Sequence, residues 1–536
     1  MASTKKLAAH LQEIGNRFDS ESQKLKSESL STIQKLHLTS SADLITLYHA
    51  LLFICAYPSS SKERNLTLNC IKHLTSFLKK NKNKHIYNNT GLPFTYSRSH
   101  FSHDFLQYLC SCKYIKVNLD SYEDSLFDLN EVLKLTLPTP EKSETTAGWN
   151  NEELLQALKV DKGNSLSLII NELSKLNSIP YIKDHLFDGL GIYIHVKPNN
   201  NKFSIDQNKF NPEKIYFHND LLKKFDHETL LNQKLPEEEK LTTSSLENYV
   251  SIIKNSMALT DRETDPVTYL DTNTLKIFHL ERGISVAIYS MTGDRHLPYE
   301  IYAGYTLFKN GYPAAYGGAW VFGKRANFGI NIFEWFRGGE SGYIMCQLLR
   351  VYRQAFGINY FEVEPYQYGL DNPDGIKSGA FWFYYRYGFR PLDKHLRLLA
   401  EKENSIIINN KKYKTTSKVL LRFTESNIAL NLEGNIPVAV PEITTKITSF
   451  ISRKFRGNRV TAEIECIANF RKKSGLNETY SNSRKYLLTE IALWCEAYNI
   501  TKKNQLELMK EMIHLKHDNI YEYQTTVTNF NEIQNK

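Results

Sequence analysis

The sequence has few cysteines, and the ones it has are scattered. There are seven, an odd number, and only Cys110 and Cys112 lie close together. This pair lacks the second pair of ligands that a zinc site of such spacing requires. A disulfide framework is therefore not expected, and the pattern favours isolated buried thiols in a reducing compartment.

Long apolar segments are also missing. The longest apolar run, residues 44–57, contains Thr46 and His49 and is too short to cross a bilayer. The beginning of the chain carries basic residues but no apolar core of signal-peptide length. We expect a soluble, cytoplasmic protein that does not bind membranes.

The sequence also lacks a strong excess of basic or of acidic residues. The formal net charge is +9, from 67 basic and 58 acidic residues spread over 536 positions. This excess is well below the footprint of a nucleic-acid-binding protein, so nucleic acid is not an expected partner. Aromatic residues, in contrast, are abundant, with 32 tyrosines and 28 phenylalanines, and they can fill large cores. The length exceeds that of one compact core and indicates several domains.

Changes in composition divide the chain into four predicted regions. They are a helical N-terminal domain (1–135), a small α+β domain with a winged-helix-like arrangement as one option (151–245), a domain with a mainly antiparallel sheet (246–430) and a helical C-terminal region (440–536). We also expect a strand at Gly191–Val196. The last polar residues, 521–536, are expected to be frayed.

The third region begins with two predicted β-hairpins. Leu275–His279 and Ile284–Tyr289 alternate like strands around a turn at 281–283. Tyr299–Phe308 and Tyr312–Val321 flank an Asn-Gly pair, which is a strong hairpin signal. Later in the same region, Ile406–Ile408 and Val419–Phe423 have the composition of strands.

Residues 328–392 have the densest pattern of the chain. A strand at Ile330–Phe336 is expected to end in the glycine-rich turn Arg337–Gly342, which leads into a helix at Tyr343–Phe356. A second strand at Ile358–Glu364 carries Glu362 and Glu364 on one face. An aromatic helix, Ser378–Tyr387, is expected to end at Gly388 and return the chain to the sheet through Phe389.

The glycine-rich turn has a functional and a structural interpretation. Glycines before a helix N-terminus let backbone N–H groups converge on a phosphate, with Ser341 as a possible N-cap and Arg337 as a direct contact. The glycines also suit a tight connection without a ligand. Glu340 would repel an anion unless its carboxylate pointed away. The turn is neither a Walker loop nor a dinucleotide fingerprint.

Together these elements resemble the GNAT N-acetyltransferase superfamily over residues 260–425. The aromatic helix matches the pattern A-x-x-F-Y-x-x-x-G-F at Ala380, Phe383, Tyr384, Gly388 and Phe389. The turn corresponds to the pyrophosphate loop Gln/Arg-x-x-Gly-x-Gly/Ala, with Arg337 and Gly342 matching and Glu340 in place of the middle glycine. The resemblance implies an α/β (α+β) fold with a mixed, mostly antiparallel central sheet, flanking helices and added helical regions at both ends.

The resemblance also implies acetyl-CoA as the co-substrate and an amine-bearing acceptor, a small molecule or a protein. Acetyl-CoA would lie between the splayed fourth and fifth strands. The implied cofactor-binding residues follow the fourth strand and its turn: Ile332, Phe333, Phe336, Arg337, Gly338, Gly339, Ser341 and Gly342. The tyrosine beside the thioester sulfur would be Tyr384, acting as a general acid toward the leaving thiolate.

The general base would be a strand carboxylate. Glu334 is the first candidate, and Glu362 or Glu364 is the second choice. A buried glutamate with a raised pKa suits a base at neutral pH. A salt bridge to Arg337, Arg350 or Arg353 is the alternative role for Glu334.

Two other functions fit the same fold. One is an aminoacyl-tRNA-dependent transferase, although residues 1–250 contain no second aromatic-helix motif. The other is a GNAT-like binding or scaffold protein without a cofactor, which the departure at Glu340 favours.

Overall fold

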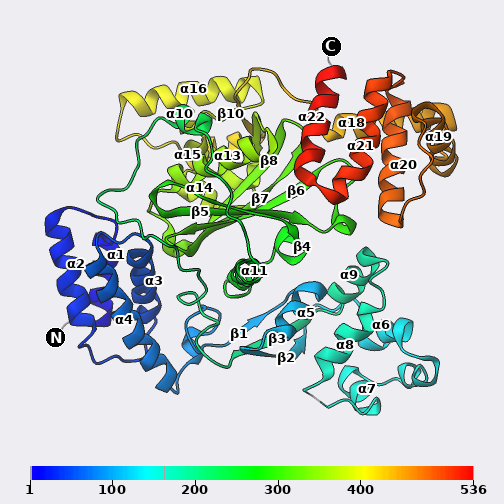
Figure 1. Ribbon diagram of the computed structural model, residues 1–536. Coiled ribbons are helices and arrows are strands. Elements are labelled where there is room, and N and C mark those ends of the chain that lie inside the picture. Colours follow the sequence, from blue (N-terminus) through cyan, green and yellow to red (C-terminus); the bar gives the residue numbers. More distant parts are fainter. Residues whose placement is uncertain (1–2, 162, 535–536) are drawn as a thin grey trace. The chain divides into compact units, whose positions relative to one another are not determined.

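The computed structural model describes residues 3–161 and 163–534. It is a mixed α/β structure with an eight-stranded mixed sheet and a three-stranded antiparallel sheet (Figure 1). The chain divides into two compact units. The first comprises the chain through Asp220 together with Thr242–Thr268 and Lys309–Pro313. The second comprises Leu221–Leu241, Tyr269–Phe308 and the chain from Ala314 onward.

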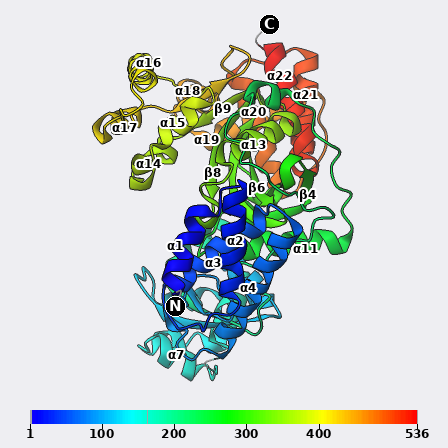
Figure 2. The same ribbon diagram turned by 90° about the vertical axis from the view of Figure 1, so that its left-hand side faces the viewer.

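The first unit begins with four helices that lie side by side (Figures 1 and 2). They are α1 (Thr4–Ile14), α2 (Ser20–Ile33), α3 (Asp43–Ala56) and α4 (Ser61–Lys80). The long apolar run of the sequence forms α3, which is buried along most of its length. It is therefore a core helix of a small bundle, as the interrupted hydrophobic pattern predicts.

The rest of the first unit surrounds the small sheet, whose strand order is β1-β3-β2. Its strands are β1 (Ser97–Ser99), β2 (Ile115–Tyr122) and β3 (Ile192–Pro198), so the predicted strand at Gly191–Val196 is confirmed. Its helices are α5 (His103–Ser111), α6 (Leu129–Thr136), α7 (Asn151–Ala157), α8 (Ser165–Ser174), α9 (Pro180–Asp188), α11 (Thr243–Ala258) and α12 (Asp265–Thr268).

The turn at Lys309–Pro313 belongs to the first unit although its flanking strands belong to the second. Asn310 and Gly311 both have positive φ angles, 45° and 87°, as the Asn-Gly pair predicts. The Asn310 side-chain amide donates to the carbonyls of Ala56 at 2.8 Å and Tyr216 at 3.0 Å. The Tyr216 N–H donates back to Asn310 Oδ1 at 2.8 Å. The turn is thus tied to two distant segments of the first unit.

The large sheet of the second unit has the order β10-β11-β9-β8-β7-β6-β5-β4. Its strands are β4 (Leu270–His279), β5 (Ile284–Met291), β6 (Ile301–Lys309), β7 (Tyr312–Phe322), β8 (Arg325–Ile332), β9 (Tyr360–Val363), β10 (Arg390–Pro391) and β11 (Ile428–Asn431). Both predicted hairpins are present, as β4–β5 and β6–β7. The pairing of β8 with β9 is parallel, whereas β7–β8 and β9–β11 are antiparallel.

Among the described residues, six further α-helices of the second unit lie before β4 or between β8 and β11 in the chain. They are α10 (His227–Asn232), α13 (Ser341–Phe356), α14 (Pro373–Ser378), α15 (Ala380–Arg386), α16 (Lys394–Asn409) and α17 (Ser417–Phe423). The predicted strands Ile406–Ile408 and Val419–Phe423 are wrong, because these residues lie in α16 and α17. Leu396, Ala400 and Glu403 are buried on one side of α16, so helical periodicity overrides the local β-branched run.

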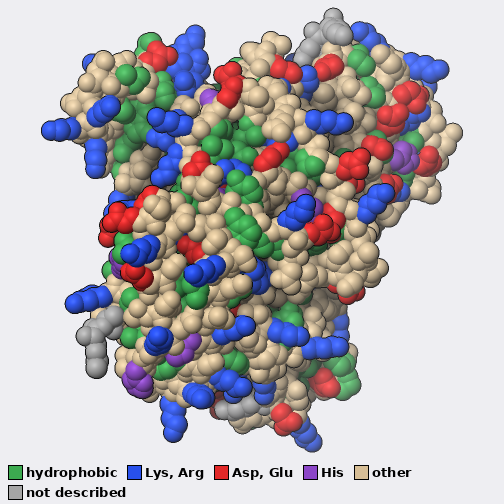
Figure 3. Space-filling view, turned by 60° about the vertical axis from the view of Figure 1, so that its left-hand side comes forward, with side chains coloured by type: hydrophobic (Ala, Val, Ile, Leu, Met, Phe, Trp, Pro, Cys, Tyr) green, Lys and Arg blue, Asp and Glu red, His purple; other side chains and the backbone are tan. Residues whose placement is uncertain are grey.

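The lobe formed by α16 and α17 carries lysine and arginine side chains on its surface (Figure 3). Apolar side chains are exposed beside them, at Leu398, Ile408 and Leu421. Within the described residues, no helix combines the length and apolar character that crossing a membrane requires.

The predicted helical C-terminal region is confirmed. It consists of α18 (Val440–Phe455), α19 (Arg459–Ser474), α20 (Asn482–Ala497), α21 (Lys503–Asp518) and α22 (Ile520–Gln534). The expectation of frayed residues near the end is wrong as far as residue 534, and residues 535–536 lie outside the described part. α22 buries Tyr523, Gln524, Val527 and Phe530, which anchor it.

Candidate active site

Strands β8 and β9 pair over a short distance and then separate. Their parallel register joins Arg325 to Tyr360, Ala326 to Phe361 and Asn327 to Glu362. Strand β8 continues to Ile332 with β7 as its partner, whereas β9 ends at Val363. The β9-facing edge of β8 therefore has no strand partner beyond residue 327 within the described chain.

Gln367 lies beside this free edge of β8. It belongs to the 3₁₀ turn Pro365–Tyr368, which follows β9. Its Oε1 accepts from the Ile330 N–H and from the Tyr384 hydroxyl, both at 3.4 Å. A Cβ on Gly329 would lie 3.3 Å from its Nε2, so the side chain lies close to the strand. Gln367 thus joins the edge of β8 to the aromatic helix.

Tyr384 lies on α15 and is 2% exposed. Burial raises the pKa of its phenol above the ordinary value near 10, so the hydroxyl is protonated at neutral pH. Its ring makes edge contacts with Phe383 and Phe389. This buried, neutral hydroxyl reaches the strand edge through Gln367, to which it already donates a hydrogen bond.

The aromatic helix is shorter than the sequence predicted. Gly379, with φ 67°, separates α14 from α15 and breaks the expected helix Ser378–Tyr387 in its first turn. The end is as predicted, because Gly388 has φ 92° and Phe389 leads into β10. The left-handed backbone at both glycines confines α15 to Ala380–Arg386.

The predicted strand Ile330–Phe336 is wrong in its second half. Ile332 is the last residue of β8, Phe333 is irregular, and Glu334–Phe336 form a 3₁₀ turn. The Phe333 N–H donates to the Ala314 carbonyl at 3.0 Å and so is not free for a ligand. Of the predicted cofactor-binding residues on this element, Ile332 alone belongs to the strand.

The turn 337–342 leads into α13 in an unexpected way. Glu340, not Ser341, occupies the N-cap position, and it makes no side-chain cap hydrogen bond. Arg337 is exposed, and its Nε donates to the Ile332 carbonyl at 3.3 Å. Gly339 is buried, whereas Gly338 is exposed.

Gly342 lies against the aromatic helix. A Cβ at this position would be 1.8 Å from the Tyr387 hydroxyl, so a larger residue would have to displace Tyr387. Tyr387 is 6% exposed and stacks on Phe225, with ring centroids 5.8 Å apart. The start of α13 is therefore covered by aromatic side chains from two other segments.

Glu340 is 1% exposed and lies in a polar network that the sequence did not reveal. Its Oε1 accepts from Arg282 Nε at 2.7 Å and pairs with Arg282 Nη2 at 2.6 Å. It also accepts from the Leu222 N–H at 2.9 Å. Arg282 lies in the β4–β5 turn with φ 59°. The carboxylate that was expected to disfavour an anion is thus neutralised by an arginine 58 residues away.

The neighbouring Glu281 extends the network along α13. It accepts from Gln347 and Arg350, each at 2.8 Å. Partial burial acts to raise the pKa of Glu281, but its hydrogen bonds and the Arg350 charge outweigh burial and lower it. Arg350 also donates to the carbonyls of Gln233 and Lys234, at 2.8 and 2.6 Å. Residues 221–241 are in this way held along α13.

The three candidate bases have different surroundings. Glu334 is exposed and lies in the 3₁₀ turn, so the expectation of a buried strand glutamate is wrong for it. Glu362 is buried and pairs with Arg325, and Asn427 donates to it. Glu364 is exposed and accepts from Asn327. Arg350, one proposed partner of Glu334, pairs with Glu281 instead.

The structure thus brings Ile332, the 337–342 turn and Tyr384 to one region of the second unit. It adds Gln367, Arg282 and the covering segment 221–241. Arg282 was visible in the sequence only as part of a turn, and nothing in the sequence distinguished Gln367. Among the described residues, no group of three or more His, Cys, Asp or Glu side chains is arranged to hold a metal ion.

Comparison of the chain with protein-family models, with curated proteins and with solved structures finds no match.

Proposed function

We propose that the second unit is an acetyl-CoA-dependent N-acetyltransferase of the GNAT type. It would transfer an acetyl group to an amine by direct attack. The observation that carries the proposal is the separation of β8 from β9 after Asn327. Beyond Asn327, the N–H and C=O groups on this edge of β8 lie near the buried Tyr384 hydroxyl. An extended ligand that contains amide groups can pair with such a strand edge.

The pyrophosphate of acetyl-CoA would lie at the start of α13. The first N–H groups of this helix have no intrahelical partners, and Glu340 at the N-cap makes no side-chain hydrogen bond to them. Arg337 is exposed beside them and can add a charge-assisted contact. Because Arg282 neutralises Glu340, the buried carboxylate adds little net repulsion toward a phosphate.

In the proposed reaction the amine nitrogen attacks the thioester carbonyl carbon, and the C–S bond breaks. The thiolate leaves with a hydrogen bond, and finally a proton, from Tyr384, and the second proton lost by the acceptor nitrogen restores the phenol. Its raised pKa keeps the phenol protonated at the working pH. The ammonium proton of the acceptor passes to water or to Glu334, since Glu362 is already paired with Arg325.

Calorimetric titration with acetyl-CoA tests the first part of this proposal. Binding in the micromolar range is expected, and no heat at high micromolar concentration would overturn it. The second part is tested by Tyr384→Phe, which should lower kcat about 10²-fold while leaving acetyl-CoA affinity unchanged. Equal loss of both would remove the acid role.

A second candidate function is that of a binding module without a cofactor. It is favoured by three contacts that already occupy the region: Gln367 on the β8 edge, Glu340 on Arg282, and the Tyr387 hydroxyl against Gly342. This candidate predicts no acetyl-CoA binding even in Gln367→Ala, in which the strand edge is free. Binding that appears only in that variant would instead support a blocked acyltransferase.

A further inference from the structure

A cavity of about 130 Å³ lies at the other end of β8, within the second unit. Four chain segments line it: the β7–β8 turn, Asn359 before β9, residues 433–438 and α22. Strand β8 has eight residues. At about 3.3 Å per residue, the cavity is roughly 20 Å or more from the start of α13. It is therefore separate from the candidate active site.

The cavity has a firmly held wall. Gln524 of α22 accepts from the Gly323 N–H at 2.7 Å and donates to the Val321 carbonyl at 3.0 Å. Gln524 is fully buried. A Cβ on Gly323 would lie 3.1 Å from Asn531 Nδ2, so α22 approaches the turn closely. These contacts fix the position of the α22 side chains that line the cavity.

Two buried polar atoms beside the cavity are unsatisfied. Thr528 and Asn531 line the cavity, and their Oγ1 and Oδ1 atoms are closed to a water-sized probe and have no hydrogen-bond partner among the described residues. Buried polar atoms are rarely left without a partner, because the loss of hydration is costly. Both atoms can accept a hydrogen bond. A bound molecule with N–H or O–H groups could therefore satisfy them.

The mouth of the cavity carries a net negative charge. Lys324 Nζ lies 3.2 Å from Glu433 and 3.0 Å from Glu532, so one cation faces two carboxylates. The next basic residue, Arg325, is paired with Glu362. Pro437 and Val438 give the remaining wall an apolar surface.

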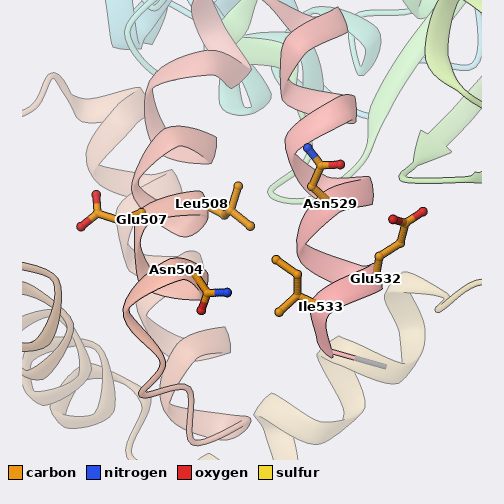
Figure 4. A pocket seen from close by; sticks show the side chains of 6 residues that line it. All are labelled: Asn504, Glu507, Leu508, Asn529, Glu532 and Ile533. Carbon is orange, nitrogen blue, oxygen red and sulfur yellow. The ribbon is translucent and has the colours of Figure 1, made fainter. Parts of the chain in front are cut away.

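Glu532 also borders an open groove between α21 and α22 (Figure 4). In that view its carboxylate points away from Asn504 and Leu508. Asn529 lies on the same helix and lines the groove rather than the cavity.

We propose that this cavity binds a small aliphatic primary ammonium ion. Its N–H groups would donate to Thr528 Oγ1 and Asn531 Oδ1 once these two side chains turn toward it. Its positive charge would offset the net negative charge at the mouth, and its hydrocarbon part would contact Pro437 and Val438. The size fits, since a cavity of about 150 Å³ holds a ligand as large as benzene. The proposal is independent of the acyltransferase reaction.

Calorimetry on the full chain with n-butylammonium chloride tests the proposal. Phosphate buffer is required, because common buffers contain amines, and acetyl-CoA is omitted so that no transfer occurs. The neutral isostere 1-pentanol is the second probe. We expect butylammonium to bind at least about tenfold more tightly than 1-pentanol, because hydrogen bonds to a charged group are the stronger ones. Equal binding, or no binding of either probe, would overturn the proposal, the latter leaving ordered water as the occupant.

Asn531→Leu locates the site and Asn529→Leu is its matched control on the same helix. The first variant narrows the cavity and removes one acceptor, so butylammonium affinity should fall about tenfold or more. The second should leave it unchanged. If Asn531→Leu retains full affinity, the amine binds elsewhere, for example at the proposed acceptor site, and the cavity assignment fails. Thermal unfolding of both variants shows whether each is folded.

Discussion

The two ends of strand β8 are both lined with polar side chains, and they differ in how far those side chains satisfy one another. At the carboxyl end, Glu340 has Arg282 and the Leu222 N–H, and Gln367 has Ile330 and Tyr384. At the amino end, Thr528 and Asn531 have buried polar atoms without a partner among the described residues. A ligand at the first end must displace existing hydrogen bonds, whereas a ligand at the second end supplies missing ones.

The difference teaches that a sequence motif and a prepared binding site need not coincide. The glycine-rich turn carries the motif, but its polar groups are paired within the chain. The cavity beside α22 carries no motif, yet Thr528 Oγ1 and Asn531 Oδ1 beside it have no hydrogen-bond partner among the described residues. Four substitutions test this contrast, from the largest expected effect to the smallest.

Glu340→Ala should have the largest effect. It removes the carboxylate that pairs with Arg282, which is only 13% exposed, and loss of one partner from a buried ion pair costs about 3 kcal/mol or more. Urea unfolding followed by tryptophan fluorescence measures this, because four of the five tryptophans lie in the second unit. Arg337→Ala, at an exposed position, is the control and should change stability little. A loss below about 0.5 kcal/mol for Glu340→Ala would mean that the pair does not hold the turn.

Gly342→Ala comes next. The added methyl group overlaps the Tyr387 hydroxyl, and crowding of this kind costs about 1–3 kcal/mol. The same urea experiment measures the loss. Gly163→Ala serves as a control, because a Cβ there meets no atom within 4 Å. Equal stability of the two variants would show that α15 can move away from α13 without cost.

Thr528→Val should raise stability by about 1 kcal/mol, because it removes a buried hydroxyl that has no partner. The same change at Thr274 should lower stability by a similar amount, since that hydroxyl accepts from the Ser290 N–H at 2.8 Å and donates to the Asp271 carbonyl at 2.7 Å. Thermal unfolding of both variants compares them directly. Destabilisation by Thr528→Val would indicate that a tightly bound water already satisfies the site.

Gln367→Ala should have the smallest effect. Its two hydrogen bonds are long, at 3.4 Å, so freeing the β8 edge should strengthen acetyl-CoA binding only about three- to fivefold. Calorimetry with acetyl-CoA measures the change, and Gln354→Ala, in the last turn of α13, is the control. Weaker binding would show instead that Gln367 contacts the ligand.

Local features of the second unit were predictable from the sequence, and long-range partners were not. The Asn310-Gly311 pair predicted the β6–β7 hairpin, and Gly388 predicted the end of α15, because both depend on the backbone freedom of adjacent residues. Ser341 failed as an N-cap because Glu340 takes that position. The end of β8 was missed because the apolar alternation continues into a 3₁₀ turn.

The partners of the site residues lie too far away in the chain for periodicity to identify them. Arg282 reaches Glu340 across 58 residues, and the polar residues of the cavity come from the β7–β8 turn, Asn359, the 433–438 segment and α22. Polar residues near the C-terminus indicated fraying, yet the six buried residues of α22 hold it in place. Only the folded chain shows which polar side chains are paired.

The turn at Lys309–Pro313 has a consequence for the order in which the protein is made. The first unit includes this turn, so it lacks the partner of Ala56 and Tyr216 until the ribosome has passed Pro313. That point comes roughly 90 residues after Asp220, which at about 5–20 residues per second is a delay of about 5–20 seconds. A nascent chain released or cleaved before it would carry an incomplete first unit with an exposed, unsatisfied surface for a chaperone or protease to recognise.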